Sequence, residues 1–178
     1  MSLFLSIGEA MVELSSAPDA GEDLWRLGFA GDTLNTAWYA RACLPDDWDV
    51  QYMTRLGQDP FSPRLLDFVA ANSIGHRFIT TEASRSVGLY AIQLENGERS
   101  FAYWRGQSAA RLLAEDPALL DEAFAAADAI YLSGITLAIL PDEGRDALIS
   151  RLSAARTASK TTIFDPNLRL KLWESADA

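Results

Sequence analysis

The sequence predicts an α/β fold in which helices cover a parallel β-sheet and a small antiparallel β lid projects from it. Short apolar runs alternate with helical patterns and short loops along residues 119–164, as in consecutive βαβ units. An Asn96-Gly97 pair between two strand-like segments indicates a hairpin outside that parallel pattern. An apolar share of 49% among 178 residues is enough for the core of one domain.

Three strands are predicted near the beginning of the chain. Residues 3–7 form an apolar run that stops at Gly8, as expected of a buried strand. Residues 11–14 and 24–29 are expected to form two more strands, because the stretch between them is rich in turn-forming residues.

A helix is predicted over residues 34–44, where apolar side chains recur at helical spacing until Pro45. Asp32 or Thr33 is the expected N-cap, with free backbone N–H groups facing Gly31. Local sequence leaves two interpretations of Gly31 open, a plain turn glycine or part of an anion-binding helix N-terminus.

The middle of the chain predicts a strand over residues 50–56, a helix over residues 63–71 and then a hairpin. The two strands of this hairpin are expected at residues 87–94 and 99–105. The Asn-Gly pair between them suits a type I′ turn, in which both central residues have positive φ.

The hairpin register places Tyr103 and Arg105 on one face, Trp104 on the other, and Tyr90 on the partner strand. Taken alone, these residues favour cross-strand packing for the tyrosines and an exposed edge position for Arg105 over ligand contacts.

The rest of the chain alternates strand and helix. Helices are predicted over residues 119–127 and 142–157, and strands over residues 129–132 and 161–164. Polar or small residues follow three strands of the predicted sheet, at 8–9, 133–134 and 165–169, and parallel sheets bind ligands at such strand ends. The residues alone thus indicate an α/β body with a β lid that binds a small polar molecule.

Composition argues against several classes of function. A formal net charge of −10 disfavours nucleic-acid and membrane partners. No apolar run approaches the roughly 20 residues that span a bilayer and no signal peptide is evident, so we expect a cytoplasmic protein. The single cysteine, Cys43, is expected to be buried, and the single histidine, His76, has no neighbours for a metal site. Walker A, G-x-G-x-x-G and G-x-S-x-G motifs are absent.

Motifs along the whole chain resemble the ribokinase-type (PfkB) carbohydrate kinases. Residues 7–14, Ile-Gly-Glu-Ala-Met-Val-Glu-Leu, are similar to the family's first strand and the beginning of its lid. Residues 29–37, Phe-Ala-Gly-Asp-Thr-Leu-Asn-Thr-Ala, resemble its N-terminal signature, with Ala30 where a glycine is usual. Residues 55–61 resemble the element after the next strand. The resemblance implies a ribokinase-like fold, with residues 1–178 as the N-terminal part of one domain and lid strands within about 10–30 and 86–105.

Within the family, residues 31–36, 99–105, 131–140 and 165–173 resemble the 2-keto-3-deoxygluconate kinase branch. This resemblance implies that the intact protein phosphorylates that sugar acid with ATP and Mg²⁺. It implies a sugar-acid pocket formed by Gly31, Asp32, Asn35, Tyr90, Tyr103, Arg105 and Arg169.

Arg105 and Arg169 would bind the carboxylate of the sugar acid, because guanidinium groups match carboxylates bidentately. Asp165 and Asn167 fall where the family places polar residues near the phosphates and magnesium. No residue of this chain is expected to be a metal ligand in its own right.

The sequence lacks the family's G-x-G-D segment, whose aspartate is the general base. The catalytic base and the C-terminal part of the fold are therefore expected outside these residues, and the chain alone is expected to be inactive. Two alternatives stay open: a kinase for another sugar, such as fructose or a related keto acid, and a non-catalytic sugar-acid binding module. A homodimer through the lid strands is also expected, because exposed strand edges favour pairing.

Overall fold

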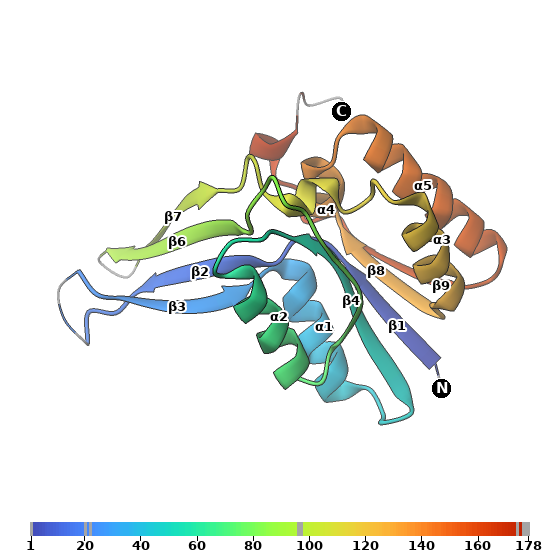
Figure 1. Ribbon diagram of the computed structural model, residues 1–178, viewed down its shortest axis with the longest axis horizontal. Helices are drawn as coiled ribbons and strands as arrows, with labels where there is room; N and C mark the ends of the chain where they lie inside the picture. Colours follow the sequence, from blue (N-terminus) through green and yellow to red (C-terminus); the bar gives the residue numbers. More distant parts are fainter. Residues whose placement is uncertain (1, 20, 22, 96–97, 174, 176–178) are drawn as a thin grey trace.

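The computed structural model describes residues 2–19, 21, 23–95, 98–173 and 175. Helices cover both faces of a five-stranded parallel sheet, and a separate four-stranded sheet lies beside it (Figure 1). The predicted fold class, a helix-covered parallel sheet with a small β lid, is confirmed.

The parallel sheet has the strand order β5-β4-β1-β8-β9. Its strands are β1 (Ser2–Ile7), β4 (Trp48–Leu56), β5 (Gly75–Thr81), β8 (Ala129–Ser133) and β9 (Thr161–Asp165). The chain adds β4 and β5 on one side of β1 and later adds β8 and β9 on the other. Such a reversal opens a crevice at the carboxyl ends of the central strands, where α/β proteins bind ligands.

Two hydrophobic layers hold the helices to this sheet. One face carries α1 (Asp32–Cys43) and α2 (Ser62–Ala71); the other carries α3 (Pro117–Ala126), α5 (Asp142–Thr157) and the short α4 (Gly134–Ile139) (Figure 1). Along β1, Leu5 and Ile7 are fully buried in the layer of α3 and α5, whereas Phe4 points into the layer of α1 and α2. A strand buried on both faces is mostly apolar, which explains why residues 3–7 are apolar except for the buried Ser6.

The lid consists of two hairpins side by side, β2 (Met11–Ser16) with β3 (Trp25–Ala30) and β6 (Gly88–Glu95) with β7 (Glu98–Trp104). Each hairpin is antiparallel as predicted, but β2 pairs with β6 in parallel, so the sheet is mixed. The reason is that β2 and β6 follow the parallel strands β1 and β5 and leave the body in the same direction. The predicted type I′ turn at 96–97 lies outside the described residues.

Among the observed strands and α-helices, the sequence does not predict β5 and α4, and it does not predict the 3-10 helices Ala109–Leu112 and Leu170–Leu172 either. Only Phe78 of β5 is fully buried, so this edge strand shows no apolar alternation. Cys43, expected to be buried, is exposed, because the buried residues of α1 lie in its first half. Among the described residues, no helix is both long and apolar enough to cross a membrane.

Candidate functional site

A cavity of about 240 Å³ lies where the carboxyl ends of β1, β8 and β9 meet the inner face of the lid. It brings together every residue expected to contact a sugar acid, and Asn167 as well. Asp165 does not line it. The lining residues are Glu9, Met11, Gly31, Asp32, Asn35, Tyr90, Phe101, Tyr103, Arg105, Ile135, Asn167 and Arg169.

Gly31 occupies the N-cap position of α1, which corrects the expectation that Asp32 or Thr33 would cap this helix. Its carbonyl oxygen accepts the first helical hydrogen bond, from the Asn35 N–H at 2.8 Å. A Cβ at position 31 would lie 2.3 Å from the carbonyl oxygen of Glu9. Glycine is therefore required where β3 passes the β1–β2 loop, and the Asp32 side chain is free to bond across the site.

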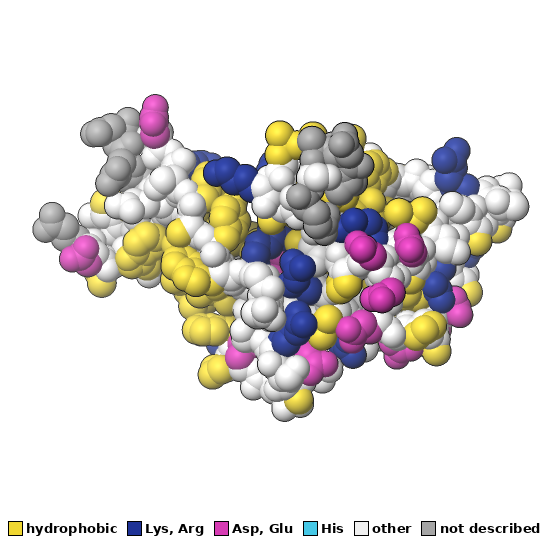
Figure 2. All heavy atoms as spheres, turned by 90° about the horizontal axis from the view of Figure 1, so that it is seen from above, with side chains coloured by type: hydrophobic (Ala, Val, Ile, Leu, Met, Phe, Trp, Pro, Cys, Tyr) yellow, Lys and Arg dark blue, Asp and Glu magenta, His cyan; other side chains and the backbone are white. Residues whose placement is uncertain are grey.

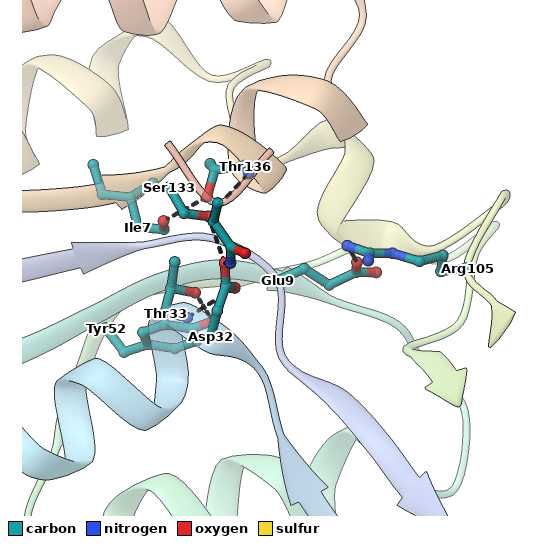
Figure 3. A network of polar contacts seen from close by, with 9 residues as sticks. Ile7, Glu9, Asp32, Thr33, Tyr52, Arg105, Ser133 and Thr136 are labelled. Carbon is teal, nitrogen blue, oxygen red and sulfur yellow. Dashed lines mark hydrogen bonds and ion pairs between the residues drawn. The ribbon is translucent and has the colours of Figure 1, made fainter. Parts of the chain in front are cut away.

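The carboxylate of Asp32 joins three segments of the chain (Figure 3). Its Oδ2 accepts hydrogen bonds from Ser133 Oγ at 2.6 Å and from Asn167 Nδ2 at 2.8 Å, and its Oδ1 accepts one from the Thr33 N–H at 2.9 Å. Asp165 accepts the Asn167 N–H at 3.1 Å. Asp32 thereby holds the end of β8 and the segment after β9 against the start of α1, and such a network preorganises the pocket wall.

Buried hydroxyl groups fix the helix N-termini beneath the pocket. Thr33 Oγ1 lies 2.9 Å from the Tyr52 hydroxyl, and Ser6 Oγ donates to the Thr33 carbonyl oxygen at 2.8 Å. Thr136 Oγ1 donates to the Ile7 carbonyl oxygen at 3.0 Å (Figure 3). Burial raises the pKa of Tyr52 well above its ordinary value, so this phenol stays neutral.

Aromatic rings from the lid form the roof of the cavity. Tyr90 faces Tyr103 across the β6–β7 register, and their rings stack with centroids 5.8 Å apart. Phe101 stacks on Tyr103 at 6.2 Å. The Tyr90 hydroxyl donates to the Glu13 carboxylate on β2, and burial together with Glu13 raises the pKa of Tyr90. The cross-strand packing that local sequence favours is therefore present, at the pocket itself.

Two arginines from different segments reach the cavity. Arg105, just after β7, has a side chain that is 11% exposed and forms an ion pair with Glu9. The local expectation of an exposed edge charge is wrong, because β7 ends where the chain returns to the body. Arg169, after β9, is exposed, and its Nη1 donates to the Leu168 carbonyl oxygen at 3.2 Å.

Four lining residues are not among the predicted substrate contacts, namely Glu9, Met11, Phe101 and Ile135, although residues 8–9 are predicted as a strand end where ligands bind. Glu9 carried a signal, because it follows directly on the first buried strand. Met11 and Phe101 share the period-two face of lid residues that point inward, so strand periodicity could have found them. Ile135 lies in α4, which the sequence does not predict.

Charged side chains are unevenly distributed over the face that Figure 2 shows. Figure 2 shows basic side chains gathered in the middle of one face, between hydrophobic side chains at the lid end and a cluster of acidic ones. In the described part of the chain, no group of three His, Cys, Asp or Glu side chains could hold a metal ion.

Comparison with known proteins gives a match along the whole chain. Residues 1–178 match the profile of a family described as "pfkB family carbohydrate kinase". The chain is 41% identical over 175 residues to the 2-dehydro-3-deoxygluconokinase of Haemophilus influenzae, covering 96% of this chain and 55% of that protein. The enzyme of the same name from Dickeya dadantii is 43% identical over 175 residues, which again cover 96% of this chain and 55% of that protein.

Solved structures match the fold. The 2-dehydro-3-deoxygluconokinase of Thermotoga maritima superposes with a TM-score of 0.81 at 21% identity, covering 97% of this chain and 53% of that one. A PfkB protein from Polaromonas sp. JS666 superposes with a TM-score of 0.80 at 25% identity, covering 99% of this chain and 59% of that one. The chain spans about half the length of the curated relatives it matches.

Proposed function

This chain belongs to the pfkB family of carbohydrate kinases, and from this premise we propose that the intact protein phosphorylates 2-keto-3-deoxygluconate at O6 with ATP. The compound is the 2-dehydro-3-deoxygluconate in the names of the relatives. In this proposal the chain supplies the sugar-acid pocket, and the reaction takes place in the cytoplasm.

The observation that carries the proposal is the presence of two arginines on the wall of one small cavity. The substrate has a permanent carboxylate at one end, which Arg105 and Arg169 match in charge and geometry. A neutral sugar would offer no anionic group to the N–H donors of Arg169, or to those of Arg105 that Glu9 does not bind.

Other lining residues suit the rest of the substrate. Asp32 and Asn35 present polar atoms to hydroxyl groups, and Gly31 leaves the floor open beside them. The stacked rings of Tyr90 and Tyr103 cover the sugar from the lid side and exclude water, which strengthens the polar contacts below.

Asp165 and Asn167 do not form a magnesium site by themselves. The Asn167 amide donates to Asp32, and Asp165 accepts the Asn167 N–H and lies outside the cavity wall. We assign to them the shaping of the pocket edge that faces the phosphates. ATP, Mg²⁺ and the catalytic base belong to the remainder of the intact protein in this proposal, and Mg²⁺ would offset the phosphate charge when bound.

The experiment measures ADP release by the intact protein with 2-keto-3-deoxygluconate and with fructose. We expect kcat/KM for the acid to exceed that for fructose by about 100-fold, since each charged hydrogen bond contributes roughly 1.5–3 kcal/mol. Arg169→Ala should raise KM for the acid about tenfold and leave KM for ATP unchanged. Arg156→Ala, an exposed arginine on α5, is the matched control.

The two alternatives give different results. Comparable turnover of fructose and the acid would identify a kinase for another sugar. Thermal stabilisation by the acid without ADP release would identify a non-catalytic binding module.

We further propose that two copies of the intact protein form a homodimer through the outer faces of their lids. Opposite the sugar pocket, this sheet carries an apolar hollow of about 420 Å³ lined by Leu14, Trp25, Leu89, Ala91 and Trp104. Trp25 is 43% exposed and Trp104 is 61% exposed. Large exposed apolar patches mark association surfaces, and a lid sheet presents the same patch on each copy.

A further inference from the structure

Glu9 is a buried carboxylate at the point where the chain leaves the parallel sheet for the lid. It lies in the loop between β1 and β2, and its side chain is 1% exposed. Burying a carboxylate is costly unless an opposite charge compensates it. The role of Glu9 therefore depends on which positive charge compensates it.

That partner is Arg105, one of the two arginines of the pocket wall. Glu9 Oε2 forms an ion pair with Arg105 Nη2, and the two side chains point toward each other in Figure 3. Within the described residues, Arg105 Nε is buried and has no hydrogen-bond partner. Because a guanidinium group has five N–H donors in a fixed fork, pairing with Glu9 leaves donors for a ligand in the cavity.

The pair connects the two points at which the chain crosses between body and lid. Glu9 precedes β2, and Arg105 follows β7. Space for the pair depends on Gly88, the first residue of β6, where a Cβ would lie 2.7 Å from Glu9 Oε1 and 3.4 Å from Arg105 Cβ. The guanidinium group is thus fixed between the lid and the body.

The two charges depend on each other. Burial raises the pKa of Glu9, and the Arg105 charge acts in the opposite direction by favouring the ionised form. In return, the carboxylate compensates the desolvation of a guanidinium group whose side chain is 11% exposed. Without Glu9, the long arginine side chain would regain rotamer freedom and turn toward water.

We propose that Glu9 is a positioning residue for substrate binding, which holds the Arg105 guanidinium group at the cavity wall so that its remaining N–H donors meet the carboxylate of the sugar acid. The inference rests on the proposed function and deepens it. Glu9 acts through Arg105, and its removal lowers affinity for the acid by releasing the arginine.

The test is a double-mutant cycle in the intact protein, with kcat and KM measured for 2-keto-3-deoxygluconate and ATP. Glu9→Ala should raise KM for the acid about tenfold or more, with kcat and KM for ATP changed by less than about threefold. Glu9→Gln keeps an acceptor oxygen and should fall between wild type and Glu9→Ala. The Glu9→Ala/Arg105→Ala double variant should have the same KM as Arg105→Ala alone.

Glu98→Ala, an exposed acid on β7, is the matched control and should behave as wild type. The proposal is overturned if KM for the acid stays unchanged or falls in Glu9→Gln, which would mean that Glu9 competes with the substrate for Arg105. Additive effects in the double variant would also overturn it. Glu9→Gln preserves shape, so it decides the question even if Glu9→Ala does not fold. Absence of turnover by the wild-type protein would instead refute the proposed function, and this inference with it.

Discussion

Gly28 and Gly31 lie three residues apart at the end of β3 and meet different surroundings. A Cβ on Gly31 would lie 2.3 Å from the carbonyl oxygen of Glu9, whereas a Cβ on Gly28 would meet no atom within 4 Å. The motif around Gly31 marks that residue in the sequence, but it does not show which atoms a side chain there would meet. The need for glycine at position 31 comes from the packing of β3 against the β1–β2 loop, directly beneath the pocket.

Gly31→Ala should lower the free energy of unfolding by about 1–3 kcal/mol, because backbone rather than a mobile side chain must yield to the new methyl group. Gly28→Ala should change it by less than about 0.5 kcal/mol, since the added methyl group has space. Urea unfolding of the intact protein measures both values. Equal stability of the two variants would contradict this account of Gly31.

At the residue scale, the family motifs predicted which residues line the pocket better than the local sequence around each residue did. The resemblance named Gly31, Asn35 and Arg169, and the structure places them at one cavity. The Glu9–Arg105 pair was not predictable, because nothing in local sequence brings together residues so far apart. Only the fold, which places the end of β7 beside the end of β1, makes a buried pair of them.

At the element scale, one carboxylate joins the loop after β4 to the beginning of β6. Asp59 Oδ1 accepts hydrogen bonds from the N–H groups of Phe61 at 2.9 Å and Ser62 at 3.1 Å. Its Oδ2 accepts hydrogen bonds from Ser62 Oγ at 2.6 Å and from the Val87 N–H at 2.9 Å. The start of α2 and the start of the second lid hairpin therefore share one anchor.

Asp59→Asn should destabilise the intact protein by about 1–3 kcal/mol at pH 7, because the amide replaces one acceptor oxygen with a donor. Partial burial acts to raise the pKa of Asp59, but hydrogen bonds from Ser62, Val87 and Phe61 outweigh it and lower the pKa. A lowered folded-state pKa stabilises the protein above the unfolded value of about 3.9, and this contribution is lost as the pH falls through the folded value.

The stability gap between wild type and Asp59→Asn should consequently narrow as the pH falls below about 4, in urea unfolding measured across that range. Asp67→Asn, an exposed acid on α2, serves as the control. A gap that stays constant with pH would show that the ionised carboxylate is not the stabilising group.

The elements that sequence predicts well are those whose burial is complete or whose turn chemistry is specific. Buried strands such as β1 and β8 read as apolar runs, and Asn96-Gly97 marks the β6–β7 hairpin. The edge strand β5 and the six-residue α4 lack both signals. The parallel pairing of β2 with β6 depends on where two distant hairpins leave the body, which no local pattern encodes.

At the scale of the whole molecule, the period of two along the lid strands places two different sets of side chains on the two faces of the lid. Tyr90 and Tyr103 point toward the cavity, while Leu89 and Trp104 point to the opposite side. The inner face suits a small polar ligand and the outer face suits a second protein surface. A lid that is covered on both sides in this way would link pocket closure to the association of two copies.

Trp104→Glu should therefore convert the intact protein from dimer to monomer, raising the dimer dissociation constant at least about 100-fold, because a charge would be buried in an apolar interface. Size-exclusion chromatography with light scattering measures the change. Ile149→Glu is the matched control, since Ile149 is 44% exposed on α5, at the far end of the molecule from the lid (Figure 1). That variant should remain a dimer with wild-type dissociation. A monomeric wild-type protein, or a Trp104→Glu variant that still dimerises, would show that the outer lid face is not a dimer interface. Its exposed tryptophans would then have to contact another partner.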